Sequence, residues 1–109
     1  MMEHKQAAAG RWNELSLIEQ MANVGCEVER AISWRKRGND DYSQKAFKRV
    51  LELLTLTIVD LKNKNRLKEL TRAREALIDY FFGDNLFLSS DRLWKKYFYP
   101  FFFAARINK

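Results

Sequence analysis

The stretch that decides the fold runs from Leu17 to Arg37 and reads LIEQMANVGCEVERAISWRKR. Its apolar residues recur at steps of four and three, the spacing of side chains along one face of an α-helix; they are Leu17, Met21, Val24, Val28 and Ala31. Gly38 follows, and glycine commonly ends helices. We therefore predict a helix over residues 12–37. Gly25 lies within its apolar face, where glycine costs roughly 1 kcal/mol relative to alanine, so we expect another helix to approach closely there.

Two further helices are predicted in the middle of the chain. One spans residues 41–62, where Asp41 followed by Gln44 is typical of an N-terminal capping box. The next spans residues 66–82, and Asn65 at the end of a short polar turn is its expected N-cap.

A last helix is predicted over residues 90–107. Ser89 or Ser90 provides its N-cap. Pro100 lies in its interior, where the missing N–H and the ring predict a kink or a restart near Tyr99.

Short turns make these helices antiparallel to their neighbours, so we predict an all-α, antiparallel four-helix bundle. We assign residues 12–109 to this single domain and residues 1–11 to a flexible N-terminal tail. The predicted core consists of the apolar residues that repeat at helical spacing: Leu17, Met21, Val24, Val28, Phe47, Val50, Leu54, Ile58, Leu70, Leu77, Phe81, Trp94, Tyr97 and Phe101.

The residue content argues against the common catalytic chemistries. The single histidine, His4, falls in the predicted tail, and the chain has one cysteine, no glycine-rich loop and no spaced set of metal ligands. We therefore expect no metal and no cofactor, and we favour a non-enzymatic role. Cys26 lies among apolar neighbours and is expected to be a small buried hydrophobe, which favours a cytoplasmic location.

No membrane association is expected. The longest uncharged run in the aromatic region, Tyr97–Ala105, is about half of the roughly twenty residues that cross a bilayer. The N-terminal residues MMEHKQAAAG lack the apolar core of a signal peptide.

The chain is basic, with 20 Lys and Arg against 14 Asp and Glu and a net charge of +6. In a bundle of alternating helices the cations divide between two ends, with Arg35–Arg37 and the group at Arg92, Lys95 and Lys96 at one of them. Nucleic-acid-binding proteins usually gather such charge on one face. The charge alone therefore favours an ordinary solvated surface over a nucleic-acid site.

The C-terminal helix carries more apolar surface than one helix face can bury, because seven of the ten residues from Trp94 to Phe103 are aromatic. We considered the bundle core, a dimer interface and a membrane anchor. An anchor needs Lys or Arg along its polar face, and none lies between Tyr97 and Ala105. We therefore predict a homodimer, with the interface at Phe98, Tyr99, Phe102 and Phe103.

Two segments resemble the HEPN superfamily of small helical-bundle ribonucleases. The segment Arg74-Glu-Ala-Leu-Ile-Asp79-Tyr80-Phe81 is similar to its signature, in which an arginine is followed after four to six residues by histidine and, in the toxin branch, soon by tyrosine. The segment Gly38–Phe47 is similar to the family's Gly-x-Tyr-x-x-Ala opening of the second helix, with extra residues inserted.

This resemblance implies an antiparallel four-helix domain that dimerises and, in toxin members, cuts RNA at a cleft. Asp79 stands where the catalytic histidine would be, and an ionised carboxylate repels phosphate, so the resemblance implies a non-catalytic member. Two functions follow. The favoured one is a self-associating module that acts through protein contacts; the alternative is a HEPN-type RNA-binding protein or residual ribonuclease of a toxin–antitoxin-like system, using Arg74, Asp79 and Tyr80. Arg74 also has a structural interpretation, as a helix residue paired with Glu27 or Glu52.

Overall fold

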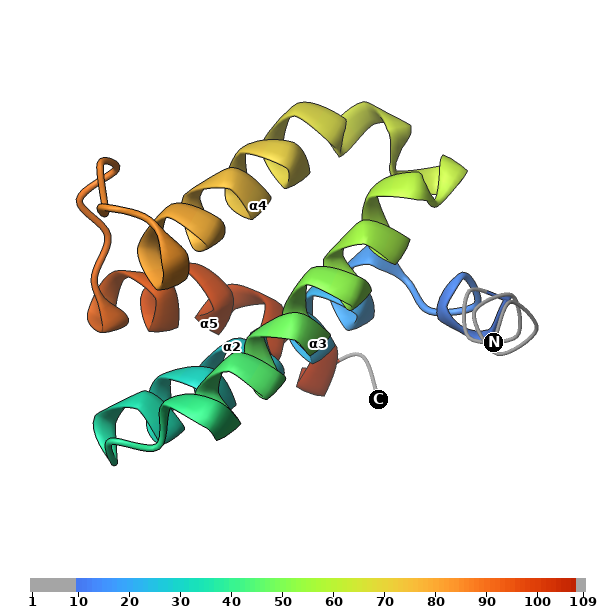
Figure 1. Ribbon diagram of the computed structural model, residues 1–109. Helices are drawn as coiled ribbons and strands as arrows, with labels where there is room; N and C mark the ends of the chain where they lie inside the picture. Colours follow the sequence, from blue (N-terminus) through green and yellow to red (C-terminus); the bar gives the residue numbers. More distant parts are fainter. Residues whose placement is uncertain (1–9, 108–109) are drawn as a thin grey trace.

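The computed structural model describes residues 10–107, and within that range the chain is helical with no strand. Four long helices follow one another (Figure 1): α2 (Leu17–Lys36), α3 (Asp40–Val59), α4 (Leu67–Phe82) and α5 (Asp91–Ile107). A 3-10 helix, η1 (Leu61–Arg66), joins α3 to α4. The all-α prediction is confirmed.

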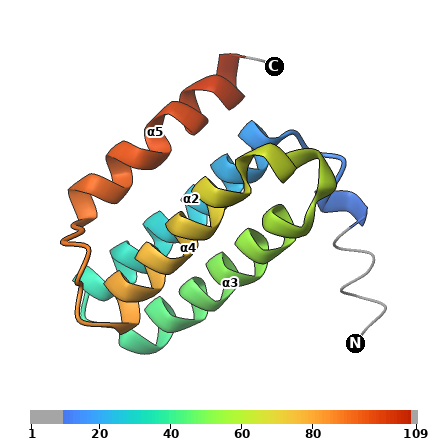
Figure 2. The ribbon, with the colours of Figure 1, turned by 90° about the horizontal axis from the view of Figure 1, so that it is seen from above.

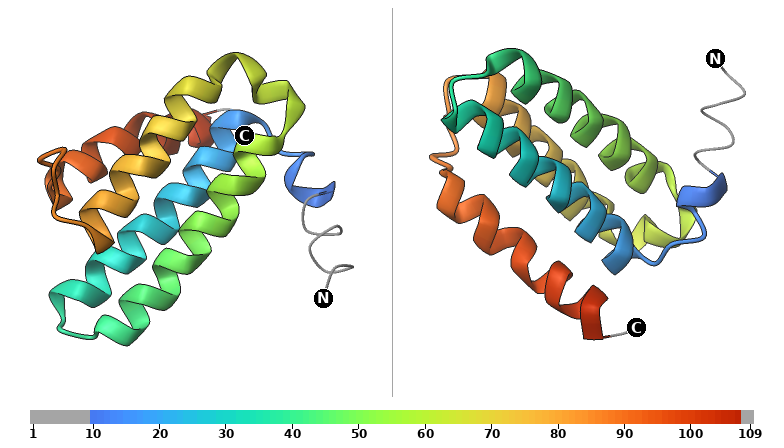
Figure 3. Two further views of the ribbon diagram at one scale, coloured as in Figure 1. Left: turned by 45° about the horizontal axis from the view of Figure 1, so that its top comes forward. Right: turned by 90° about the horizontal axis from the view of Figure 1, so that it is seen from below.

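The helices form a compact single globule with α2 at its centre. Helices α3, α2 and α5 lie side by side in that order, and α4 packs on one face of the layer they form, running alongside α2 and α3 (Figures 2 and 3). The tight turn after Lys36 brings α2 and α3 into antiparallel contact, while α5 packs on the opposite side of α2.

The first long helix begins later than predicted because Ser16 provides a strong N-terminal cap. Its side chain accepts a hydrogen bond from the Glu19 N–H, and the Glu19 side chain accepts one from the Ser16 N–H, which completes a capping box. Trp12 therefore lies outside α2, in a separate helical turn.

The expected boundaries in the middle of the chain also shift. Asn39, rather than Asp41, caps α3, accepting a hydrogen bond from the Tyr42 N–H. The extended backbone of Asp60 ends α3 before Lys62. Asn65 lies within η1 instead of capping α4, which begins at Leu67 without a side-chain cap.

Helix α5 runs without interruption through Pro100, so the predicted restart near Tyr99 is wrong. Pro100 and Lys96, one turn earlier, are both exposed. Water can therefore satisfy the Lys96 carbonyl that loses its helical donor. Ser90 caps the helix as predicted, accepting a hydrogen bond from the Leu93 N–H.

The predicted core is largely confirmed. Nine of its members are buried: Met21, Val24, Val28, Phe47, Val50, Leu54, Leu70, Leu77 and Trp94. The other five are partly buried against this core: Leu17, Ile58, Phe81, Tyr97 and Phe101. Phe98, predicted to lie at a dimer interface, is instead fully buried.

The prediction for Cys26 is wrong, because its side chain is exposed. Successive helix residues point about 100° apart, so Cys26 turns away from the face that buries Gly25. Partial burial raises the pKa of the Cys26 thiol, and the nearby Glu29 and Glu27 carboxylates raise it further. A raised pKa keeps the thiol protonated and less nucleophilic at neutral pH.

Candidate functional site

One side of α5 presents large apolar side chains to solvent. Tyr99 is 62% exposed, Phe103 is 50% exposed, and their rings stack with centroids 6.4 Å apart. Leu93 and Ile107 are similarly exposed. We call these four residues, with the exposed Pro100 between them, the outer face of α5. It contains two of the predicted interface residues, Tyr99 and Phe103.

Phe98 belongs to the opposite, inner face of α5, which corrects its predicted place in the interface. Its ring packs against α2 where Gly25 has no side chain, with Trp94 one turn away. Phe102 is half-buried and also reaches Gly25. The close helix approach predicted at Gly25 is confirmed, and it is this approach that sets the rotation of α5.

Burial on the inner face also affects Tyr97, whose hydroxyl lies between α5 and α4. Desolvation and the Glu69 carboxylate raise the pKa of Tyr97 to about 12. The phenol is therefore neutral over the physiological range. Its role here is packing, through edge-to-face contacts with Trp94 and Phe98.

The loop before α5 carries a second exposed apolar group. Leu86, Phe87 and Leu88, which we call the loop tip, are 80%, 57% and 80% exposed. The Asp79 carboxylate on α4 accepts hydrogen bonds from the Leu86 and Phe87 N–H groups at 2.9 and 3.0 Å. Three consecutive apolar side chains are thus held in solvent by a fixed backbone.

Two residues of this loop adopt left-handed backbone conformations, Asn85 with φ 55° and Leu88 with φ 56°. The Asn85 side chain exchanges two hydrogen bonds with the backbone of Ser89. Asparagine tolerates this region, whereas leucine pays roughly 1–2 kcal/mol for it. The surrounding hydrogen bonds therefore hold Leu88 in a conformation that its side chain disfavours.

The residues predicted to bind RNA do not converge. Arg74, Asp79 and Tyr80 are five and six positions apart on α4, and at about 100° per residue they point in three different directions. Arg74 is half-buried and makes no hydrogen bond or ion pair with the described residues. Its predicted partners bind elsewhere, Glu27 to Arg30 and Glu52 to Arg49.

Tyr80 instead joins α4 to α2 and to α5. Its hydroxyl donates a hydrogen bond to Asp91 Oδ1 at 2.5 Å, and Arg35 Nη2 lies 3.5 Å from the same oxygen. The Arg35 guanidinium also lies 4.6 Å from the Tyr80 ring centroid and 4.5 Å from that of Phe81. Burial, followed by the hydrogen bond to Asp91, raises the pKa of Tyr80. This cluster fastens α2, α4 and α5 together at one end.

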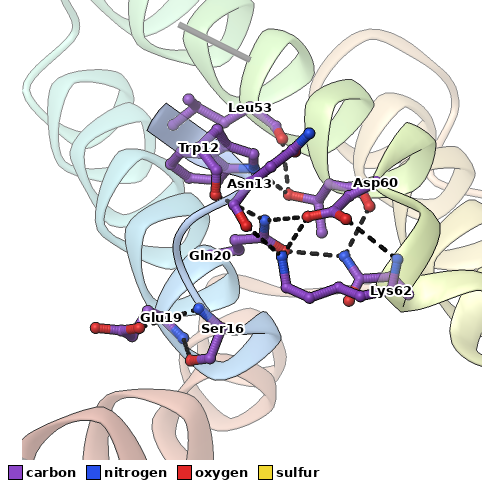
Figure 4. Close-up of polar contacts among 10 residues, drawn as sticks. Trp12, Asn13, Ser16, Glu19, Gln20, Leu53, Asp60 and Lys62 are labelled. Carbon is purple, nitrogen blue, oxygen red and sulfur yellow. Dashed lines mark hydrogen bonds and ion pairs between the residues drawn. The ribbon is translucent and has the colours of Figure 1, made fainter. Parts of the chain in front are cut away.

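A buried polar cluster at the other end was not predicted (Figure 4). Gln20 Nε2 donates hydrogen bonds to the Trp12 carbonyl and to Asp60 Oδ2, and Asn63 Nδ2 donates to Gln20 Oε1 at 2.9 Å. The Trp12 indole N–H donates to Thr57. These bonds tie the N-terminal turn and α2 to the junction of α3 and η1.

Asp60 is the charged member of this cluster. Burial opposes its ionisation, but hydrogen bonds from Lys62 and Gln20 outweigh burial and lower the pKa of Asp60. Lys62 Nζ pairs with the carboxylate and also donates to the Asn13 carbonyl. A polar Gln20 beside the apolar stripe was the available sequence signal, although it did not identify Asp60 or Asn63 as its distant partners.

A shallow cavity between α2 and α3 sets cationic side chains beside aromatic rings. The cavity has a volume of about 350 Å³ and is lined by Glu27, Arg30, Trp34, Tyr42, Lys45, Ala46 and Arg49. The Trp34 and Tyr42 rings meet edge to face at 4.8 Å, with Arg37 over Trp34 and Lys45 over Tyr42. Cations already cover these rings, so base stacking would require Arg37 or Lys45 to move.

The described residues hold neither a candidate metal site nor a candidate membrane span. No three His, Cys, Asp or Glu side chains within residues 10–107 are grouped to hold a metal ion. Within the same range, no helix is long and apolar enough to span a membrane.

Comparison with protein-family models, with curated proteins and with solved structures finds no match to this chain.

Proposed function

We propose that this chain is a non-catalytic, antiparallel four-helix module of the cytoplasm that forms a homodimer through the outer face of α5 and acts through protein contacts. One observation carries the proposal: Tyr99 and Phe103 remain at least half exposed after the inner face of the same helix has filled the core.

The energetics support a second copy of the chain as the partner of this face. Fully burying an aromatic side chain contributes on the order of 2 kcal/mol. A closed two-fold contact buries the same residues on both chains, so four half-exposed rings per dimer offset part of the entropy lost on association.

Light scattering tests the proposal directly. We expect the wild-type chain at micromolar concentration to have twice its 13.0 kDa mass. A Tyr99→Ser/Phe103→Ser variant should have the monomer mass with an unchanged helical circular dichroism spectrum. The matched control is Val59→Ser/Leu61→Ser. It removes two exposed apolar side chains where α3 meets η1, on the opposite side of α2 from α5. A wild-type monomer would refute the proposal.

RNA binding is the second candidate, supported by the cavity that Arg30, Lys45 and Arg49 line. Salt separates the two functions. Phosphate binding weakens steeply as salt rises. An apolar contact between two basic chains should be unchanged or become stronger as salt rises, because salt screens the repulsion between the chains. A gel shift with single-stranded RNA at low salt that is lost in Arg30→Ala/Arg49→Ala would favour this candidate. Loss in Arg74→Ala instead would favour the HEPN-type arrangement.

A further inference from the structure

The outer face of α5 is too small to hold two chains together alone. An aromatic side chain buries roughly 150–250 Å², so the half-exposed rings of Tyr99 and Phe103 supply about 200 Å² between them. Even with Leu93 and Ile107 added, this remains about half of the roughly 800 Å² that each partner buries in a stable interface. A dimer built on α5 therefore needs adjoining apolar surface.

The loop tip is the nearest such surface along the chain. It immediately precedes α5, and its three side chains are more exposed on average than those of the outer face. The loop meets α5 at the N-terminal end of that helix (Figure 1). Its backbone is already fixed by Asp79 and Asn85, so little ordering entropy is lost when it docks.

Four cavities formed by the described residues give the loop tip no apolar counterpart. The cavity between α2 and α3, two cavities around Asp40, and one on α4 are each lined by at least two charged side chains. A protruding leucine would desolvate those charges without replacing their hydration. The C-terminal end of the second copy's α5, where Phe103 and Ile107 are exposed, fits the loop tip better.

Charge decides the orientation of the two α5 helices. Arg92, Lys95 and Lys96 are exposed near the N-terminal end of α5, whereas its last turn carries Arg106. Parallel pairing would set three cations against the same three on the other copy, and such like-charge contacts are costly. In antiparallel pairing the three cations face only the single Arg106 of the other copy's last turn, which is the smaller repulsion.

We infer that two copies pair their α5 helices antiparallel about Pro100, and that the loop tip of each copy packs against the C-terminal end of the other copy's α5. Leu93 and Ile107 each lie seven residues from Pro100, so the two-fold axis sets Leu93 of one copy opposite Ile107 of the other. The loop tip then lies just beyond that pair. This inference rests on the proposed dimer and specifies its interface.

Cysteine cross-linking tests the orientation. In a Cys26→Ser background, which removes the native exposed thiol, we expect Leu93→Cys/Ile107→Cys to form a covalent dimer on mild oxidation. Leu93→Cys alone should stay uncross-linked. Efficient cross-linking of Leu93→Cys alone would indicate parallel helices and overturn the inference, as would a wild-type dimer whose Leu93→Cys/Ile107→Cys form does not cross-link.

Loss of affinity tests the loop tip. We expect Leu86→Ser/Leu88→Ser to raise the dimer dissociation constant at least tenfold in sedimentation equilibrium, with Val59→Ser/Leu61→Ser unchanged. Wild-type affinity in the loop variant, together with a monomeric Tyr99→Ser/Phe103→Ser variant, would refute the inference and leave the proposed function standing. A monomeric wild-type chain would refute both.

Discussion

An ideal Cβ atom on Gly25 would lie 2.8 Å from both Cγ and Cδ1 of Phe98, closer than real Cβ contacts come. The hydrogen atom of this glycine is therefore what allows the fully buried Phe98 ring to rest on the backbone of α2. The contact lies at the centre of the α2–α5 interface, so it also determines which aromatic residues α5 turns to solvent.

Gly25→Ala should destabilise the fold. Overpacking a core costs about 1–3 kcal/mol, while alanine regains about 1 kcal/mol of helix propensity, so we expect a net loss of about 1 kcal/mol in urea unfolding. Gly10→Ala is the control, because no atom lies within 4 Å of its Cβ position. A Gly25→Ala variant more stable than wild type would contradict this packing.

The sequence predicts local features of this fold better than distant pairings. Helical spacing located the apolar faces of α2 and α3, and Gly25 correctly marked a close helix contact. Helical spacing does not determine the rotation of α5, because aromatic residues occupy nearly every direction around it and Phe98 and Tyr99 are equally suited to the core. The contact with Gly25, more than seventy residues away, decides between them.

Polar residues show the same limit. Gln20, Asp60 and Asn63 satisfy one another across 40 or more positions, and no local pattern links them. The HEPN-like segment illustrates the converse: Asp79 and Tyr80 match a sequence motif, yet Asp79 binds the loop backbone and Tyr80 binds Asp91. Two residues of the motif, Asp79 and Tyr80, therefore make contacts that hold the fold together. Arg74 stays a predicted RNA contact.

Acid should weaken the polar cluster around Asp60. Its folded-state pKa is lowered, so it adds stability above its unfolded pKa of about 3.9, and that contribution is lost as pH falls through the folded value. We expect unfolding free energy to drop below about pH 4. In Asp60→Asn, the drop should be smaller and stability at pH 7 about 1–3 kcal/mol lower. An unchanged acid slope in the variant would contradict the assignment.

Asp79→Ala should release the loop tip while leaving the helices intact. The Leu86 and Phe87 N–H groups would lose their shared acceptor, so their amide hydrogens should exchange faster. Global stability should fall by about 1 kcal/mol. Asp84→Ala, which changes an exposed carboxylate in the same loop, should leave the exchange of both amides unaltered.

Tyr80→Phe should loosen the end of the molecule where α2, α4 and α5 meet. The variant keeps the ring beneath Arg35 but removes the hydroxyl that donates to Asp91. A hydrogen bond to a charged acceptor contributes about 1.5–3 kcal/mol, and partial exposure of Asp91 places the expected loss near the lower limit. Thermal unfolding measures it against Tyr42→Phe, whose side chain is exposed and lies outside the proposed interface. Equal melting temperatures for the two variants would contradict a structural role for the Tyr80 hydroxyl.

Leu88→Gly should separate stability from association. Glycine adopts a φ of 56° without the penalty that leucine pays there, so removing the side chain should raise the unfolding free energy of the monomer by up to about 1 kcal/mol, less the flexibility gained by the unfolded chain. The same change deletes one of the three side chains of the loop tip, so the dimer should weaken.

Urea unfolding of the monomeric Tyr99→Ser/Phe103→Ser chain, with and without Leu88→Gly, measures the change in monomer stability. Sedimentation equilibrium of the otherwise wild-type chain measures the change in dimer affinity. Leu88→Ala is the control, since alanine loses the side chain but keeps the strain, and should weaken the dimer without stabilising the monomer. If Leu88→Gly left the unfolding free energy and the dimer dissociation constant unchanged, Leu88 would neither strain the monomer nor contribute to the dimer.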